Sequence, residues 1–361
     1  MLPYFTERPG NPSSIHSFGQ QAHLGLNAAR ESAAKALGCG LEEIIFTSGA
    51  TEANNMVIRG MAAGYKLWAG KFGHIITSQI EHPCVLESCR WLEKEGFEVT
   101  YLPVDTQGVV SVQSLQEALR EDTVLVSIMA ANNEVGTIQP IAEIGKIVQE
   151  RGIFFHTDAV QYYGYFPCRV RDLGVSSLVL SAHKFGGPKG IGLAYVKKGA
   201  TIQPLIVGGG QEFRLRSGTQ NVPGAVGMGR AMKIVESERE EKQKKVEALR
   251  EAFLENFKLQ ISNFKLNGSD HSFVPHILNI EFPGVDAAKL VVRLDLEGVA
   301  VSTGSACSNI DSDLSHVLTA MGRGEGQARS SVRFSFGTMT TVEELQRAAI
   351  ILEHVVNDLV R

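Results

Sequence analysis

The 361-residue sequence lacks the features typical of membrane, secreted or nucleic-acid-binding proteins. No stretch approaches the roughly 20 consecutive apolar residues that a transmembrane helix requires. The opening MLPYFTERPGNPSSIHSFG has no basic segment followed by an apolar core, so it does not resemble a secretory signal. The net charge of −4 gives no excess positive charge to attract nucleic acid or an anionic membrane.

Cysteine is scarce, and its spacing excludes two common uses. The five cysteines are scattered, odd in number and never form a C-x-x-C pair, which indicates neither a zinc site nor a disulfide framework. We therefore expect no metal and a reducing, cytoplasmic setting in which a special cysteine would act as a thiol. The five are Cys39, Cys84, Cys89, Cys168 and Cys307.

The composition is that of an ordinary globular protein, with 43% hydrophobic and 20% charged residues. Between residues 41 and 210, short apolar runs alternate with amphipathic segments, which predicts an α/β fold with a largely parallel sheet. Near residue 224 a long charged helical pattern begins and continues to about 255. A compact α+β region follows it. We predict a large domain over residues 1–230 and a smaller one over residues 231–361. The strands expected in the large domain are 44–49, 74–78, 97–104, 123–130, 152–159, 177–183 and 190–198.

The segment IIFTSGATEANN places small polar residues between a strand and a helix. The unpaired amides of such a helix start attract anions, so Ala50 and Thr51 could contact a phosphate. The alternative is an ordinary helix cap made by Ser48 or Thr51. No G-K-[ST] or G-x-G-x-x-G pattern follows, which excludes a P-loop and argues against a dehydrogenase.

Further polar residues stand where two other strands end. Asp158 follows GIFFHT, at the edge of a parallel sheet where ligands bind, and could hold a proton on a cofactor ring nitrogen or merely cap the next helix. Asn132, Asn133 and Glu134 follow TVLVSIMA and could hydrogen-bond a ring substituent.

The segment SAHKFGGPKGIG places Lys184 beside His183 at the end of an apolar run. Partial burial there would favour the neutral, nucleophilic amine. An anion cradle, an acid and a lysine at successive strand ends together predict an enzyme that uses pyridoxal 5′-phosphate (PLP), of unspecified reaction.

A set of ordered motifs then narrows this prediction. FTSGATEANN, EHPCVLESC, NNEVGTIQPI, HTDAVQ, SAHKFGGPKGIG, GGGQEFRLRSGTQNV, STGSACS and SVRFSFGT occur across nearly the whole chain. The chain thereby resembles the cysteine desulfurases of the NifS/IscS type, within the class V aminotransferase-like branch of the fold-type I PLP enzymes. This resemblance implies a large, mainly parallel sheet flanked by helices, with a smaller α+β domain that carries a catalytic cysteine.

The resemblance also implies an activity. L-cysteine would be converted to L-alanine, with the sulfur left as a persulfide on Cys307, in a loop of small residues after an apolar strand. Lys184 would attach to the cofactor, and His82 would stack on its ring and assist proton transfer. The sulfur would pass to an acceptor or iron–sulfur scaffold protein.

Binding roles follow from the same resemblance. Asp158 would pair with the pyridine nitrogen of the cofactor, Gln161 would hydrogen-bond its phenolic oxygen, and Asn133 with Arg333 would bind the substrate carboxylate. Thr219, in RSGT, would reach the phosphate of a neighbouring subunit, which implies a homodimer. The residues expected to contact the phosphate within the same chain are Ala50, Thr51, Ser181 and His183.

Three alternatives remain. A selenocysteine lyase or another class V lyase or aminotransferase would share the cofactor residues, but a simple aminotransferase needs no mobile thiol. The family pattern usually has about 20 further residues ahead of MLPYF, which leaves open a truncated, inactive relative that serves as an interaction protein.

Overall fold

The computed structural model describes residues 1–261, 263–304 and 314–360, which form two compact units. The first contains residues 1–102, 112–130 and 140–239, and the second contains 103–111, 131–139 and the part from Glu240 onward. The sequence pattern places the division at residue 230, whereas the structure divides the chain after Arg239 and assigns two short segments of the first half to the second unit. Among the described helices, none combines the length and apolarity that crossing a bilayer would require.

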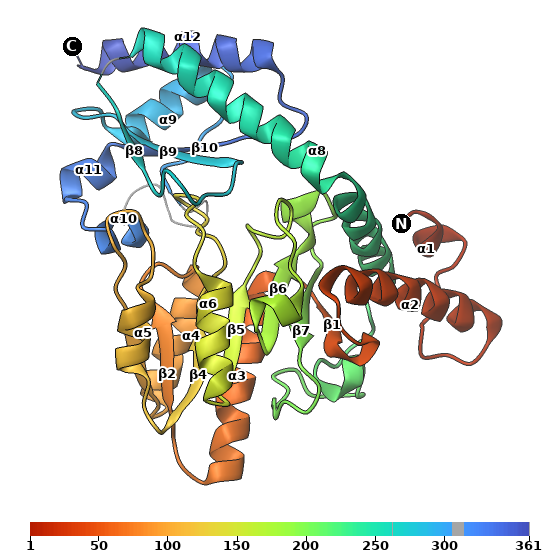
Figure 1. The fold of residues 1–361 in the computed structure, drawn as a ribbon. Coiled ribbons are helices and arrows are strands. Elements are labelled where there is room, and N and C mark those ends of the chain that lie inside the picture. Colours follow the sequence, from red (N-terminus) through yellow and green to blue (C-terminus); the bar gives the residue numbers. More distant parts are fainter. Residues whose placement is uncertain (262, 305–313, 361) are drawn as a thin grey trace. The chain divides into compact units, whose positions relative to one another are not determined.

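The first unit is built on a seven-stranded sheet of order β1-β7-β6-β5-β4-β2-β3 (Figure 1). Strand β7 is antiparallel to both of its neighbours and the other pairs are parallel. All the strands except β3 are buried along their whole length, as expected for a sheet covered on both faces. The strands are β1 (Ile44–Thr47), β2 (His74–Ser78), β3 (Glu98–Leu102), β4 (Thr123–Ser127), β5 (Phe154–Asp158), β6 (Ser177–Ser181) and β7 (Gly192–Val196).

Helices cover this sheet with apolar side chains. Helix α3 packs on α4 and the sheet, burying Met56 and Val57 against Ile45, Ile75 and their neighbours. Helix α6 packs on β5 and α7. The helices are α1 (Pro3–Thr6), α2 (Ser17–Leu37), α3 (Ala50–Ala69), α4 (Pro83–Lys94), α5 (Val112–Ala118), α6 (Ile141–Glu150) and α7 (Val170–Leu173), with short 3₁₀ helices η1 (Leu41–Glu43), η2 (Ala182–Phe185) and η3 (Glu212–Arg214).

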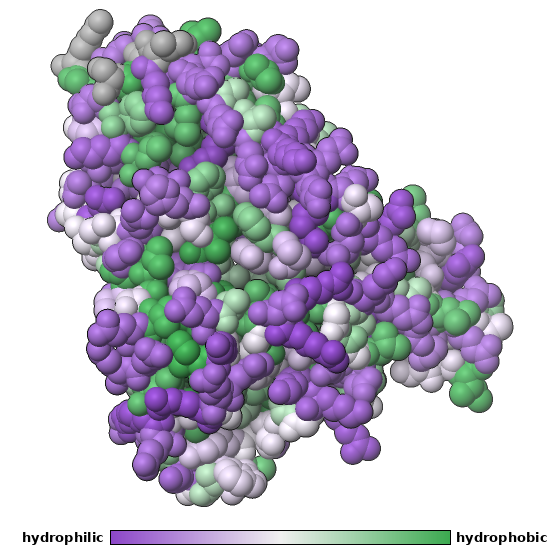
Figure 2. Space-filling model, in the orientation of Figure 1, coloured by the Kyte–Doolittle hydropathy of each residue, from purple (hydrophilic) through white to green (hydrophobic). Residues whose placement is uncertain are grey.

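The long helix α8 (Val222–Gln260) runs from the first unit into the second. Its visible face is mainly hydrophilic in Figure 2, as the charged sequence pattern predicts for a solvated face. Within the second unit its Phe253 packs against Phe257, Phe334 and Phe336.

The second unit contains a three-stranded antiparallel sheet of order β10-β9-β8, with α9 packed on α12 and on β10. Residues 299–301 do not form the strand expected ahead of Cys307, and the next residue, Ser302, makes an isolated bridge with Arg333. The elements are β8 (Lys265–Asn267), β9 (Ile277–Glu281), β10 (Ser331–Ser335), α9 (Ala287–Leu296), α10 (His316–Ala320), α11 (Glu325–Arg329) and α12 (Val342–Val360).

Candidate active site

Most of the predicted site residues of the first unit lie at one edge of its sheet. Strands β1 and β6 both pair antiparallel with β7, so they run in the same direction as each other and as β5. Thr47 and Ser181 both face Gly192 in register. The carboxyl ends of these strands therefore share an edge, the usual ligand-binding edge of an α/β sheet.

The turn between β1 and α3, which the sequence suggests as a phosphate site, ends at Gly49. Gly49 is the N-cap residue of α3 and makes no side-chain cap bond. The alternative in which Ser48 or Thr51 caps the helix is therefore wrong. The backbone N–H of Ser48 donates to Glu52 Oε2 (2.9 Å). Ala50 and Thr51 supply the first amides of a 20-residue helix, whose start favours an anion.

Gly192 allows β7 to approach this turn closely. A Cβ atom at this position would lie 2.7 Å from the carbonyl oxygen of Leu180 and 2.8 Å from backbone atoms of Gly49. Both neighbours are backbone and cannot rotate away. A glycine at position 192 is therefore needed to bring β1, β7 and the start of α3 together.

Asp158 ends β5 and is held by a buried polar network. Its Oδ2 accepts a hydrogen bond from Asn54 Nδ2 (2.7 Å) and its Oδ1 accepts one from the Val160 N–H (3.0 Å). Asn54 Oδ1 lies 2.9 Å from His156 Nε2, and burial lowers the pKa of His156 to about 3, so the imidazole is neutral and donates. The carboxylate is thus fixed in orientation at the strand end.

Sequence reasoning missed Asn54. It lies on α3 between the buried Ala53 and Met56 and is itself fully buried. The available signal was an amide within the apolar stripe of a helix, because a buried amide must be hydrogen-bonded.

His82 is the cap residue of α4. Its Nδ1 accepts from the Cys84 N–H (3.2 Å) and lies 3.0 Å from Cys84 Sγ. An accepting Nδ1 places the proton of the neutral ring on Nε2, the nitrogen that would then exchange protons with a ligand.

Glu81 fixes the connection that carries His82. It is fully buried, and its Oε1 accepts from Ser78 Oγ (2.7 Å) and from the Met129 N–H (2.9 Å). Burial raises the pKa of this carboxyl to about 8. The residue therefore ties the ends of β2 and β4 together beside His82.

Lys184 lies in η2, directly after β6. Ser181 Oγ is 3.0 Å from His183 Nδ1, and the pKa of His183 is lowered by desolvation of the ring by nearby protein atoms and by the charges of Lys184 and Lys189. Lys184 and His183 are both exposed among the described residues, so the partial burial of the lysine expected from the sequence is not found there. Gly186, with φ 88°, ends the turn in a left-handed conformation.

Gln161 and Thr219 belong to the same unit. Gln161 is half-buried in the turns after β5, and Thr219 is exposed in the segment between η3 and α8. Ahead of Thr219, Arg216 forms an ion pair with Glu52 of α3 (Nε to Oε1, 2.7 Å).

The second unit brings Asn133 and Arg333 together. Arg333 Nη1 donates to the carbonyl oxygen of Asn133 (2.9 Å). Two of the atoms expected to hydrogen-bond a ring substituent have partners within this unit. Asn132 Oδ1 accepts from the N–H of Glu134 (2.8 Å), and Glu134 Oε2 accepts from Ser315 Oγ (2.5 Å).

Cys307 lies outside the described residues. The other four cysteines are free thiols, and Cys84, Cys89 and Cys168 are buried, as expected for structural cysteines. Cys39 is only half-buried. Burial raises the thiol pKa of Cys39, Cys84 and Cys89 to about 12, which makes each a poor nucleophile.

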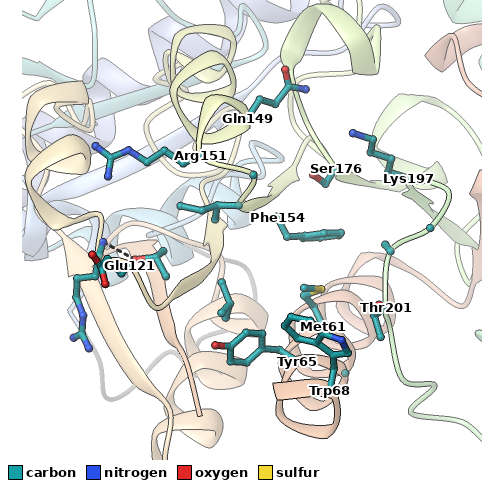
Figure 3. A pocket seen from close by; sticks show the side chains of 18 residues that line it. Met61, Tyr65, Trp68, Glu121, Gln149, Arg151, Phe154, Ser176, Lys197 and Thr201 are labelled. Carbon is teal, nitrogen blue, oxygen red and sulfur yellow. Dashed lines mark hydrogen bonds between the residues drawn. The ribbon is translucent and has the colours of Figure 1, made fainter. Parts of the chain in front are cut away.

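A hollow of about 940 Å³ lies at the opposite edge of the sheet, near the amino ends of β4 and β5 (Figure 3). Met61, Tyr65 and Trp68 of α3 lie across from Phe154 and Lys197 in this view. None of the predicted site residues lines it.

Comparison with known proteins decides the family. The Aminotransferase class-V family model matches residues 1–348. A cysteine desulfurase IscS of Dictyoglomus turgidum is 48% identical over 359 residues, which cover 99% of this chain and 90% of that protein. The chain belongs to the class V aminotransferases, in their cysteine desulfurase group. A solved NifS-like protein has a TM-score of 0.92 and 40% identity, with 99% of this chain and 94% of that chain covered. The structure of SspA in complex with cysteine has a TM-score of 0.83 and 38% identity, with 94% of each chain covered.

The cysteine desulfurases use PLP, and the chemistry of the carboxyl edge fits this cofactor. The cofactor needs donors for a phosphate, an acid for its ring nitrogen and an amine for its aldehyde. The start of α3 supplies amides, Asp158 an oriented carboxylate and Lys184 an amine.

Proposed function

We propose that the protein converts L-cysteine to L-alanine and leaves the substrate sulfur as a persulfide on Cys307. The observation that carries this proposal is the full-length similarity to proteins named cysteine desulfurase, joined to the placement of Lys184, Asp158 and His82 around one sheet edge. The solved relative with bound cysteine supports the same substrate.

Bound PLP would withdraw electrons from the substrate α-carbon and so make its proton acidic. Asp158 would hold a proton at the pyridine nitrogen, since its orientation is fixed by Asn54 and Val160. The amides of Ala50 and Thr51, with Ser181 and His183, would hold the phosphate. Gln161 would hydrogen-bond the phenolic oxygen.

The substrate carboxylate is assigned to Arg333 with Asn133. A guanidinium binds a carboxylate through two parallel hydrogen bonds, which fixes the orientation of the amino acid. His82 moves protons through Nε2, because its Nδ1 is engaged by the Cys84 N–H.

The sulfur transfer balances without an external oxidant. The Cys307 thiolate forms a bond to the substrate sulfur while the substrate carbon–sulfur bond breaks. The electron pair of that bond stays with the carbon, which takes a proton and becomes the methyl group of alanine. Free cysteine and the Cys307 thiol thus yield alanine and a persulfide.

The partners we propose are a second copy of the chain and a sulfur acceptor, such as an iron–sulfur scaffold protein. Exposed apolar side chains on the first two helices, among them Phe5 (61%), Phe18 (55%) and Leu24 (67%), support an interface between copies. We place the reaction in the cytoplasm, because Cys307 must be a reduced thiol to attack.

The test is to incubate the purified protein with L-cysteine and to measure alanine and sulfide with and without a thiol reductant. Cys307→Ser should abolish both products and keep the cofactor absorbance, since a hydroxyl cannot accept the sulfur. Unchanged turnover in Cys307→Ser would contradict the persulfide step and favour another class V lyase or aminotransferase. Loss of the absorbance in that variant would count against the assigned role of Cys307.

A further inference from the structure

The short helix η3 contains three consecutive non-glycine residues in a left-handed backbone conformation. Glu212, Phe213 and Arg214 have φ values of 46°, 56° and 68°, and they are the non-glycine residues with positive φ in the described part of the chain. Residues with a Cβ rarely adopt this conformation, and runs of it persist only where the surroundings enforce it. Gly208, Gly210 and Gly218 stand close by in the sequence, yet the left-handed run falls on residues 212–214.

A buried ion pair enforces the turn. Arg30 of α2 binds Glu212 through two parallel hydrogen bonds, Nη2 to Oε1 (2.7 Å) and Nη1 to Oε2 (2.9 Å). The two side chains are 6% and 1% exposed. Glu212 Oε2 also accepts from the Phe46 N–H of β1 (2.8 Å), and Arg30 donates to the Ile44 carbonyl oxygen.

Phe213 contributes to the same arrangement. The Arg30 guanidinium lies 4.9 Å from the centre of the Phe46 ring and 5.0 Å from that of Phe213. Phe213 remains 51% exposed. The turn is therefore anchored to the edge strand β1 by a buried ion pair, with the half-exposed Phe213 beside it.

Hydrogen bonds between the segments before and after η3 close the loop that contains it, and an exposed segment follows. The Gly218 N–H donates to Gln211 Oε1 (2.8 Å), and the Ser217 N–H donates to the Ile206 carbonyl oxygen (3.1 Å). Arg216 is held by Glu52 at the start of α3. Thr219 then stands exposed beyond these anchors.

We propose that the Arg30–Glu212 pair is a positioning device: it holds residues 212–214 in the left-handed turn so that residues 216–219 are presented, preorganised, to the cofactor phosphate held by a second copy of the chain. This inference rests on the homodimer of the proposed function. Arg30 and Glu212 act through Thr219 and touch no reacting atom. Preorganised donors bind an anion more tightly because less conformational freedom is lost on binding.

The proposal predicts an effect across the dimer. Glu212→Gln keeps an acceptor for the Phe46 N–H but removes the charge that faces Arg30, so the turn should relax. The cofactor dissociation constant, measured by absorbance titration of protein stripped of PLP, should rise about tenfold. Glu42→Gln, which removes an exposed ion pair with Lys198 in the same unit, is the matched control and should leave that constant unchanged.

Mixed dimers separate positioning from a merely structural role. Two differently tagged chains are co-purified, and one of them carries Lys184→Ala, so that one lysine-bearing site is titrated per dimer. With Glu212→Gln on the Lys184→Ala chain, the titrated site receives its Thr219 from the altered loop, and the tenfold weakening is expected. With Glu212→Gln on the lysine-bearing chain, the titrated site receives a wild-type loop, and affinity within about twofold of wild type is expected.

Other outcomes overturn the inference. Weakening only when Glu212→Gln lies on the lysine-bearing chain would mean that the pair supports β1 and α3 within its own chain. Equal affinities in both arrangements would mean that the pair does not position the loop. If Glu212→Gln fails to fold, Glu212→Asp, which keeps the charge but is too short to span both partners, should show the same asymmetry at about threefold or more.

Measuring the mass of the wild-type protein in solution distinguishes failure of the positioning proposal from failure of the desulfurase proposal. A dimer without the asymmetry removes the positioning role and leaves the desulfurase assignment intact. A monomer that still produces alanine would remove the dimer and, with it, the role proposed for the pair.

Discussion

Polar side chains at the two edges of the large sheet differ in burial and in hydrogen bonding. At the carboxyl edge, Asp158 and Glu81 are buried and hydrogen-bonded to neighbours on other elements. At the amino edge, Arg120 pairs with Glu98 and Asp122, whose side chains all remain partly exposed, and a hollow of about 940 Å³ is lined partly by aromatic side chains. Exposed ion pairs contribute about 0–1 kcal/mol each, whereas buried polar groups are costly unless they are fully paired.

The hollow at the amino edge lies away from the residues to which we assign the chemistry. The carboxyl edge holds two residues whose pKa values burial shifts strongly, Glu81 and His156, together with the helix start and the lysine. Buried groups with perturbed pKa values concentrate at functional sites.

The largest effect is expected from Asp158→Asn. The amide cannot form an ion pair with a protonated ring nitrogen, and loss of one partner of a buried, hydrogen-bonded charge pair costs about 2–5 kcal/mol, or roughly 30-fold or more in turnover. Alanine production under saturating cysteine measures it. The control is Asp172→Asn, an exposed carboxylate of the same unit. A loss below about threefold in Asp158→Asn would remove Asp158 from its assigned role.

A smaller effect is expected from Gly192→Ala, which places a methyl group against the backbone of Leu180 and Gly49. Overpacking of this kind costs about 1–3 kcal/mol, and it should also weaken cofactor binding because the start of α3 must move. Urea unfolding and cofactor titration report the two consequences. Gly326→Ala, in the exposed helix α11 with open space around it, should instead stabilise the protein by about 0.5–1 kcal/mol. Unchanged cofactor affinity in Gly192→Ala would show that the close approach is not needed.

Glu81→Gln should change the pH dependence of stability. The carboxyl has a pKa of about 8 in the folded state against an ordinary value of 4.5, so between these values the folded state keeps a proton that the unfolded state releases. The free energy of unfolding therefore falls as pH rises, by about 1.4 kcal/mol per pH unit.

His156 acts in the opposite direction below pH 6.5, because its folded-state pKa is about 3 and the unfolded state takes up the proton. The window from pH 6.5 to 8 isolates Glu81 from this effect. We expect wild type to lose about 2 kcal/mol relative to Glu81→Gln across that window, measured by urea unfolding at both pH values. Parallel curves for the two proteins would mean that Glu81 is ionised in the folded state throughout.

The smallest effect is expected at the amino edge. Trp68 is 81% exposed beside the hollow, so Trp68→Ala should change stability by no more than about 0.5 kcal/mol and turnover by less than about twofold. Steady-state kinetics and thermal unfolding measure both quantities. A large loss of turnover would mean that the amino edge takes part in the reaction.

Much of the large unit could be predicted from the sequence. Each of the seven apolar runs between residues 44 and 198 contains a strand, because strands buried on both faces give continuous apolar runs. Asp158 and Lys184 became candidates because each ends or follows such a run, whereas the role of Ser181 came from the resemblance. The desulfurase assignment came from ordered motifs, which no single segment provides.

Other features could not be predicted from local patterns. The antiparallel placement of β1 beside β7 depends on long-range pairing, and helix α2 lies in a stretch to which no element was assigned from the sequence. Asn54, Glu81 and the Arg30–Glu212 pair depend on partners up to 182 positions away in the sequence. The hydrogen bonds of Asn132 and Glu134 within the second unit are likewise visible only in three dimensions.

The most direct test of the account is to locate the cofactor. Protein purified with PLP would be reduced with borohydride, digested and mapped by mass spectrometry. We predict a pyridoxyl group on Lys184 and on no other lysine. A label on a different lysine, or none on protein that still releases alanine from cysteine, would contradict the assignment of the carboxyl edge as the active site.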